Sequence, residues 1–166
     1  SFEHARHDSV DASRRLFELN WDPNEHTPIA QGDTALTSID DAWNRGALAA
    51  SAQLVGLSHQ MLDMTIEYAK TRTQFGKAIG TFQAIKHKLA DAWLKLEFAR
   101  PVVYRAAHSL SQAREPQRVH VAMAKAYASE LGMHASKTAL QCHGVASTSL
   151  GKRVIYWSSD PIACAV

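Results

Sequence analysis

Long runs of helical periodicity, separated by two short connections, constrain the fold of this chain more than any other feature of its sequence. The first run extends from Thr37 to about Arg72, and Ser38 with Asp41 has the spacing of a capping box at its start. At ~1.5 Å per residue such a helix is roughly 50 Å long, far above the average for globular proteins. A helix of this length needs long neighbours for support. Its small and apolar positions are Leu48, Ala52, Val55, Leu62, Ile66 and Ala69.

A second helix is predicted to begin after Thr81, whose hydroxyl can cap it, and to end near Gln112. Pro101 lies inside this helix and predicts a kink, because proline lacks the amide hydrogen that the helical ladder needs. The apolar positions of this helix are Phe82, Ile85, Leu89, Trp93, Leu96 and Val103. These positions predict that one side of the second helix packs along the first helix.

A third helix is predicted from Glu115-Pro116, where proline suits the first turn, to about His143. Gly144 follows and can take the left-handed conformation that ends helices. Small residues make up the predicted inner stripe, which allows another helix to approach closely. This stripe consists of Ala122, Ala126, Ser129, Gly132, Ala135 and Ala139.

The short connections force these helices to run up, down and up. The sequence therefore predicts a mainly α fold, antiparallel and four-helix-bundle-like, over residues 36–166. The arrangement of residues 145–166 is harder to predict, since they could form a strand or a short helix.

Residues 1–35 differ in composition and pattern from the rest of the chain. They are polar, and apolar residues alternate at period two from Arg15 to Trp21, which predicts a strand with Phe17, Leu19 and Trp21 on one face. A single strand is not stable alone. We interpret this short β or irregular segment as a linker or as the end of a β-domain.

Composition excludes several classes of function. The formal charge is +2, and basic residues alternate with acidic ones, so binding to nucleic acid or to a membrane surface is not expected. No apolar run approaches the ~20 residues needed to span a bilayer, which favours a cytoplasmic protein. The two cysteines, Cys142 and Cys164, are far apart, and the histidines form no Glu-x-x-His pair. No metal site is predicted.

The connection between the first two helices carries the most informative chemistry. Arg72 precedes Gln74 and Phe75, and Gly76 and Gly80 punctuate the segment. A guanidinium, an amide and an aromatic ring could hold a phosphate and a flat ring system. Local chemistry alone also permits an ordinary glycine-containing loop.

Residues 67–91, which read EYAKTRTQFGKAIGTFQAIKHKLAD, strongly resemble the helix-loop-helix signature of acyl-CoA dehydrogenases. The likeness continues through residues 122–130, which read AMAKAYASE, and reaches Gln141-Cys142-His143-Gly144. It covers about residues 37–145. The resemblance implies a C-terminal four-helix bundle that follows a helical domain and a middle β-domain, with residues 1–35 as the end of the β-domain.

By this resemblance the cofactor is FAD, shared with a neighbouring subunit. Arg72 would contact the FAD pyrophosphate of that subunit, and Gln74 and Phe75 would lie along the same cofactor. Gln141 and Gly144 would stand where the third helix ends against the pyrophosphate. The family has further glycines after this point, whereas Val145, Ala146 and Ser147 follow here, and their side chains would crowd the backbone.

The resemblance implies α,β-dehydrogenation of an acyl-CoA thioester, as in fatty acid metabolism, which needs a carboxylate base. In relatives the base lies beyond the third helix, which projects just past Val166, or near the position of Gly46. No Asp or Glu occurs between Trp43 and Asp63. The chain alone is therefore expected to be non-catalytic, and Arg45 could serve a phosphate of CoA.

The expected partners are acyl-CoA and either further copies of this chain or another acyl-CoA dehydrogenase subunit. Two alternatives remain at this point. The first is a helical module for dimerisation or scaffolding that has lost flavin binding. The second is a stand-alone helical protein that binds some other ligand.

Overall fold

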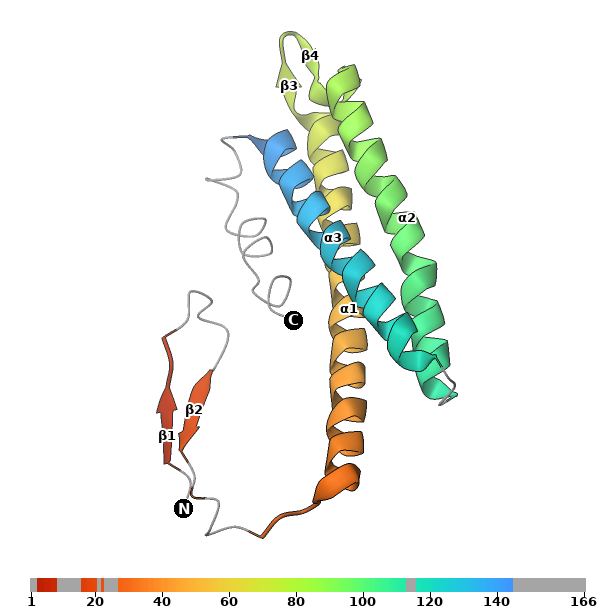
Figure 1. Ribbon diagram of the computed structural model, residues 1–166. Helices are drawn as coiled ribbons and strands as arrows, with labels where there is room; N and C mark the ends of the chain where they lie inside the picture. Colours follow the sequence, from red (N-terminus) through yellow and green to blue (C-terminus); the bar gives the residue numbers. More distant parts are fainter. Residues whose placement is uncertain (1–2, 9–15, 21, 23–26, 113–115, 145–166) are drawn as a thin grey trace. The chain divides into compact units, whose positions relative to one another are not determined.

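The computed structural model describes residues 3–8, 16–20, 22, 27–112 and 116–144 (Figure 1). The chain forms two compact units, Ser1–Ala42 and Trp43–Val166. The described residues are mainly helical, which confirms the predicted fold class. Residues 145–166, which would complete a four-helix bundle, lie outside the described part. Within the described part, no helix is both long and apolar enough to cross a membrane.

The first unit contains an antiparallel hairpin. Strand β1 (Glu3–Arg6) pairs with β2 (Phe17–Asn20), and the amide of His7 donates to the carbonyl of Leu16 at 3.0 Å. Strand β2 confirms the strand predicted around Phe17 and Leu19, both of which are exposed. Strand β1 was not predicted, because its four residues show no alternation of apolar and polar side chains.

Helix α1 (Gly32–Thr71) begins five residues before the predicted start at Thr37. The predicted cap at Ser38 is wrong, because its hydroxyl donates to the carbonyl of Thr34 at 2.9 Å inside the helix. Thr37 bonds the carbonyl of Asp33 in the same way, at 2.8 Å. Serine and threonine can bond the preceding turn as well as cap a helix, so their position alone did not fix the start.

Helices α2 (Gln83–Ser111) and α3 (Gln117–His143) run antiparallel, side by side. Helix α2 is continuous through Pro101. The predicted cap at Thr81 is wrong. Its hydroxyl donates to the carbonyl of Ala78 at 2.7 Å in a short 3₁₀ helix, η2 (Ile79–Thr81), and Phe82 precedes α2 without a side-chain cap.

The core of the second unit draws on all three helices. Its main cluster consists of Met61, Leu62, Ala92, Leu96, Ala99, Leu131 and Ala135. The small residues let the helices approach closely. A Cβ at Gly132 of α3 would lie only 3.1 Å from the Leu54 Cδ2 atom of α1.

The predicted stripe of α3 is partly wrong. Gly132, Ala135 and Ala139 are buried as predicted, whereas Ala122 and Ala126 are exposed. The buried positions in the first half are instead Val121, Ala124, Lys125 and Ala128. Alanines lie on both the buried and the exposed sides of this half of the helix, so composition could not identify the side that faces the core.

Truncating Leu62, which is fully buried at the centre of the main cluster, tests this description of the core. We expect Leu62→Ala to lower the free energy of unfolding by about 3 kcal/mol, through lost burial and a residual cavity. The measurement is urea denaturation followed by circular dichroism. The control is Leu36→Ala at an exposed position of α1, which should change stability by no more than ~0.5 kcal/mol.

Candidate functional site

The connection between α1 and α2 is a tight β-hairpin rather than an irregular loop. Strands β3 (Thr73–Gln74) and β4 (Lys77–Ala78) pair antiparallel, with Gln74 opposite Lys77. Phe75 and Gly76 form the two-residue turn, and their φ values are 54° and 78°. Positive φ at both central positions is what a type I′ turn requires.

Phe75 is an unusual residue for such a turn. Asn, Asp or Gly normally occupies the first central position, and positive φ strains a bulky side chain. The side chain is also 92% exposed, with only an edge contact to the Phe82 ring at 6.2 Å between centroids. Burial within the bundle therefore does not explain this phenylalanine. Strain that internal packing does not explain is typical of sites that bind something else.

The hairpin is fixed firmly to the end of α1. The amide of Ile79 donates to the carbonyl of Arg72 at 2.9 Å. A Cβ at Gly80 would lie 3.0 Å from the carbonyl oxygen of Ala69, so a side chain there would displace the backbone. The Lys77 ammonium lies 4.6 Å from the centroid of the Phe82 ring, a cation–π contact. The tip of the hairpin thus projects from a rigid base.

The other predicted residues of this segment also face outward. The amide of Arg72 donates to the carbonyl of Tyr68 at 2.8 Å, while its guanidinium is exposed. The Gln74 amide donates to the neighbouring Thr73 carbonyl at 2.8 Å and is likewise exposed. Arg72, Gln74 and Phe75 therefore present a cation, an amide and a ring to solvent from one short segment.

A ring stack joins the end of α3 to the end of α1. The Tyr68 and His143 rings lie 4.2 Å apart between centroids, with 25° between their planes. Gln141, exposed in the last turn of α3, and Gly144, which follows α3 with φ 55°, therefore lie at the same end of the bundle as Arg72. The contact between Tyr68 and His143 was not predicted from the sequence, since only the fold brings these two residues together.

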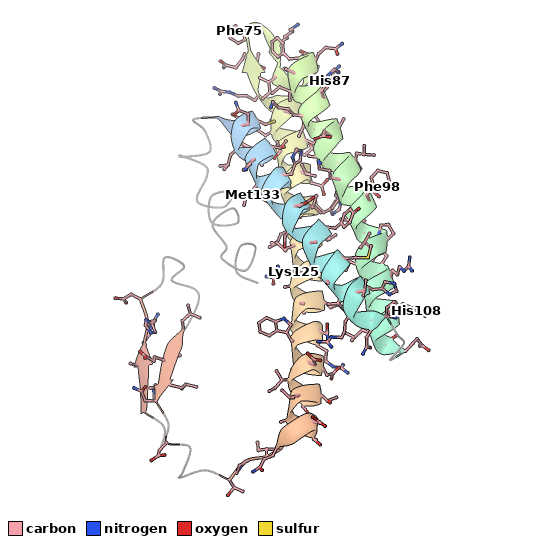
Figure 2. All side chains as sticks on the ribbon, in the orientation of Figure 1. Phe75, His87, Phe98, His108, Lys125 and Met133 are labelled. Carbon is pink, nitrogen blue, oxygen red and sulfur yellow. The ribbon has the colours of Figure 1, made fainter. Side chains whose placement is uncertain are left out.

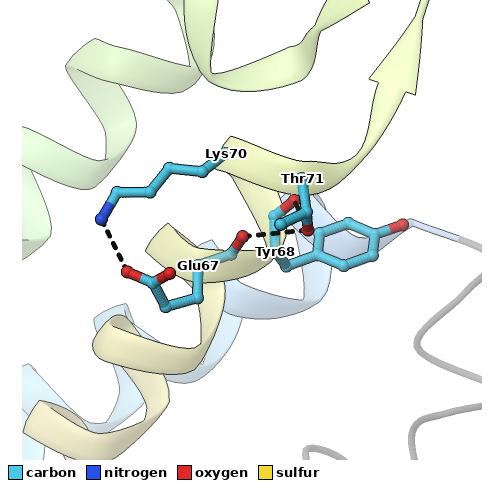
Figure 3. A network of polar contacts seen from close by, with 4 residues as sticks. All are labelled: Glu67, Tyr68, Lys70 and Thr71. Carbon is cyan, nitrogen blue, oxygen red and sulfur yellow. Dashed lines mark hydrogen bonds and ion pairs between the residues drawn. The ribbon is translucent and has the colours of Figure 1, made fainter.

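The last turn of α1 is held by local bonds, as Figure 3 shows. The Lys70 ammonium lies 2.6 Å from a Glu67 carboxylate oxygen, and the Thr71 hydroxyl donates to the carbonyls of Glu67 and Tyr68 at 3.1 and 3.2 Å. The lysine charge is thus paired within the helix. The guanidinium of Arg72 therefore supplies the cation at the start of the hairpin.

Positive charge also reaches this end from α2. Burial raises the pKa of the Cys142 thiol in α3, and the nearby charge of Lys88 opposes that rise. Lys88 therefore lies within electrostatic reach of the last turn of α3. The positive end of the α2 dipole lies at this end together with the negative ends of α1 and α3, so the helix dipoles give no net preference. The side-chain charges of Arg72 and Lys88 are what suit this end of the bundle to an anionic group such as a phosphate.

Arg45 does not belong to this end of the bundle. It is exposed on α1 and precedes Arg72 by 27 positions, which is about 40 Å along a helix. Among the described residues, no group of three potential metal ligands occurs. Val145, Ala146 and Ser147, which depart from the family pattern, lie outside the described residues.

A family model described as the C-terminal domain of acyl-CoA dehydrogenases matches residues 36–159. The chain belongs to the acyl-CoA dehydrogenase family. It is 38% identical over 136 residues to acyl-CoA dehydrogenase IpdE2 of Mycolicibacterium smegmatis, covering 82% of this chain and 39% of that protein. The chain thus spans about two fifths of the length of this curated relative.

Two solved structures resemble the chain. Glutaryl-coenzyme A dehydrogenase in its glutaryl-CoA complex has a TM-score of 0.86 at 28% identity, over 99% of this chain and 43% of that one. The FAD complex of PigA has a TM-score of 0.62 at 34% identity, over 68% of this chain and 30% of that one. The first of these likenesses includes residues of both units.

Replacing Phe75 by asparagine tests whether its conformation is strained. Asparagine tolerates the left-handed region, so we expect Phe75→Asn to leave the free energy of unfolding unchanged or to raise it by about 1 kcal/mol. In the control, Phe82→Asn, a half-buried ring is lost and stability should fall. A larger loss for Phe75→Asn than for Phe82→Asn, in chemical denaturation, would contradict the outward-facing, strained assignment.

The His143 imidazole gives the stability a defined pH dependence. Burial lowers its pKa below 6.5, so the unfolded chain binds the proton first as pH falls below 6.5, and the free energy of unfolding decreases. His143→Phe keeps a ring against Tyr68 and removes this titration. We expect the stability of the wild type relative to the variant to be lower at about pH 5.5 than at about pH 7.5. Equal differences in urea denaturation at the two pH values would refute this.

Proposed function

We propose that this chain helps to bind FAD at a subunit interface for the α,β-dehydrogenation of acyl-CoA thioesters. The observation that carries the proposal is the exposed, strained turn at Phe75 next to the exposed guanidinium of Arg72. A group that these residues bind must come from outside their own bundle, since the side chains face away from it. A cofactor held mainly by a neighbouring subunit meets this requirement.

The exposed residues fit the parts of FAD. A guanidinium can form two parallel charge-assisted bonds to phosphate oxygens, which suits Arg72 to the pyrophosphate. The Gln74 amide and the Phe75 ring offer a hydrogen-bond partner and an aromatic surface to the rest of the cofactor. Gln141 and the backbone at Gly144 complete the proposed cofactor-binding set at the end of α3. When bound, FAD would supply the hydride acceptor for the reaction.

The chain's own contribution is to position the cofactor rather than to move the substrate's proton. Helix α1 carries no Asp or Glu between Trp43 and Asp63, and in this proposal the carboxylate base comes from another part of the enzyme. Arg45, distant along α1 from the hairpin, would serve a phosphate of the CoA portion. In this proposal the chain alone is not catalytic, and its assembly with identical or related subunits completes the site.

Arg72→Ala tests the proposal directly. We expect FAD affinity of the assembled protein to fall at least tenfold, because a charge-assisted contact worth about 1.5–3 kcal/mol is lost. Arg72→Lys should be intermediate, because an ammonium keeps the charge without the planar fork. Flavin content is measured by visible absorbance and by the fluorescence of released flavin.

The control is Arg105→Ala, an exposed arginine of α2 far from the hairpin, which should retain flavin. Two outcomes contradict the proposal. One is wild-type protein that stays colourless with FAD and its partner subunits, which supports a scaffolding module instead. The other is equal flavin content in Arg72→Ala and the wild type.

A further inference from the structure

Lys88, in the second turn of α2, is a cation at the hairpin end of the bundle that the proposed cofactor-binding set does not include. Its side chain is exposed, and among the described residues it forms no ion pair. Figure 2 labels its neighbour His87 and, at the same end of the bundle, Phe75 of the hairpin. The Lys88 charge is therefore available to a bound group.

The side of α2 that carries Lys88 faces α3. Asp91 and Ala92 follow Lys88 by three and four residues, which places all three on one side of the helix. Asp91 Oδ2 lies 2.9 Å from His134 Nε2 of α3, and Ala92 is fully buried in the main cluster. Because α2 begins where α3 ends, Lys88 lies nearer to the end of α3 than Asp91 does. The charge of Lys88 accordingly acts on the Cys142 thiol, which is buried in the last turn of α3.

Side-chain cations must supply the attraction for a phosphate at this end, because the helix dipoles give none. Helices α1 and α3 end here with the negative ends of their dipoles, which offset the positive start of α2. Arg72 lies on the α1 side of this end, and Lys88 lies on its α2 side. Two cations from different helices can each attract one phosphate of a pyrophosphate.

The other lysines near the hairpin are less suited to this role. The Lys70 ammonium pairs at 2.6 Å with a carboxylate of its own helix, and Lys77 lies over an aromatic ring. Lys86 precedes Lys88 by two residues, which is about 200° around the helix, so it lies on the other side of α2.

We propose that Lys88 is a second cation for the FAD pyrophosphate, acting together with Arg72. This rests on the function proposed above and adds a residue of α2, so that all three helices contribute to the site. A guanidinium can bind phosphate through two parallel bonds, whereas an ammonium attracts it as a compact charge. The contribution of Lys88 is therefore mainly electrostatic and weakens as the salt concentration rises.

Lys88→Gln tests the proposal in fluorescence titrations of the assembled protein with FAD. We expect affinity for FAD to fall about threefold to tenfold, because one charged contact with phosphate is lost. The salt dependence of FAD binding should become shallower for the same reason. Lys88→Arg keeps the charge and should retain the affinity and the salt dependence of the wild type.

Lys86→Gln is the matched control, because it removes the same charge from the opposite side of the same part of α2. It should leave the affinity for FAD and its salt dependence unchanged. If Lys88 only stabilises the end of α3, Lys88→Gln will lower the free energy of unfolding without FAD and leave the salt dependence of FAD binding as in the wild type. That result would overturn the proposal.

The outcomes separate this proposal from the one on which it rests. Equal affinities of Lys88→Gln and the wild type for FAD, with weakened binding in Arg72→Ala, would overturn the role of Lys88 and leave the proposed function standing. Equal losses in Lys88→Gln and Lys86→Gln would reveal a general effect of charge and would also overturn that role. A wild-type protein that binds no FAD together with its partner subunits would overturn both proposals.

Discussion

A side-chain contact joins α1 and α3 in the middle of the bundle, and the end of α3 meets the end of α1 beside the hairpin. The contact in the middle depends on residues without bulk, since a Cβ on Gly132 would come within 3.1 Å of Leu54 in α1. Further along the same pair of helices, Tyr68 stacks on His143 at 4.2 Å. The end of α3 can therefore stand beside the first residues of the hairpin. Arg72 and Gly144 thus lie at the same end of the bundle.

The hairpin combines a rigid base with a strained tip. Gly80 fits against the carbonyl of Ala69, and the amide of Ile79 holds the carbonyl of Arg72, so the base cannot shift easily. The tip carries Phe75 in a conformation that glycine or asparagine would adopt at lower cost. A binding role for the ring gives this cost a reason, since the bundle itself gains little from it. In the proposed binding role, stability and binding would make opposite demands at Phe75.

The sequence predicted the helices well but not all of their ends. Leu62, Leu96 and Val103 are buried, as their periodicity predicted, because large apolar side chains mark only one side of each helix as the core side. In α3, alanines lie on both the buried and the exposed sides, so two of the six positions predicted for its inner stripe, Ala122 and Ala126, are exposed. The start of α1 was missed because Gly32 and Asp33 add length without adding an apolar face. Helix propensity and apolar periodicity do not locate the start of a helix whose first turn is stabilised by neither packing nor a cap.

The candidate site could likewise be predicted only in part. The residues of the hairpin could be found in the sequence because they are contiguous and chemically distinctive. The turn geometry of Phe75, by contrast, depends on the register of two-residue strands, which no periodicity reveals. The Tyr68–His143 stack joins residues 75 positions apart and requires the folded bundle.

Buried Cys142 offers an internal reporter of this end of the molecule. Because burial raises the pKa of its thiol, the nucleophilic thiolate is scarce in the folded protein. Alkylation at this position must therefore wait for a local opening of the last turn of α3. The rate of alkylation would measure how often this end of the bundle opens locally. A ligand that binds at the same end and stabilises it would slow the reaction.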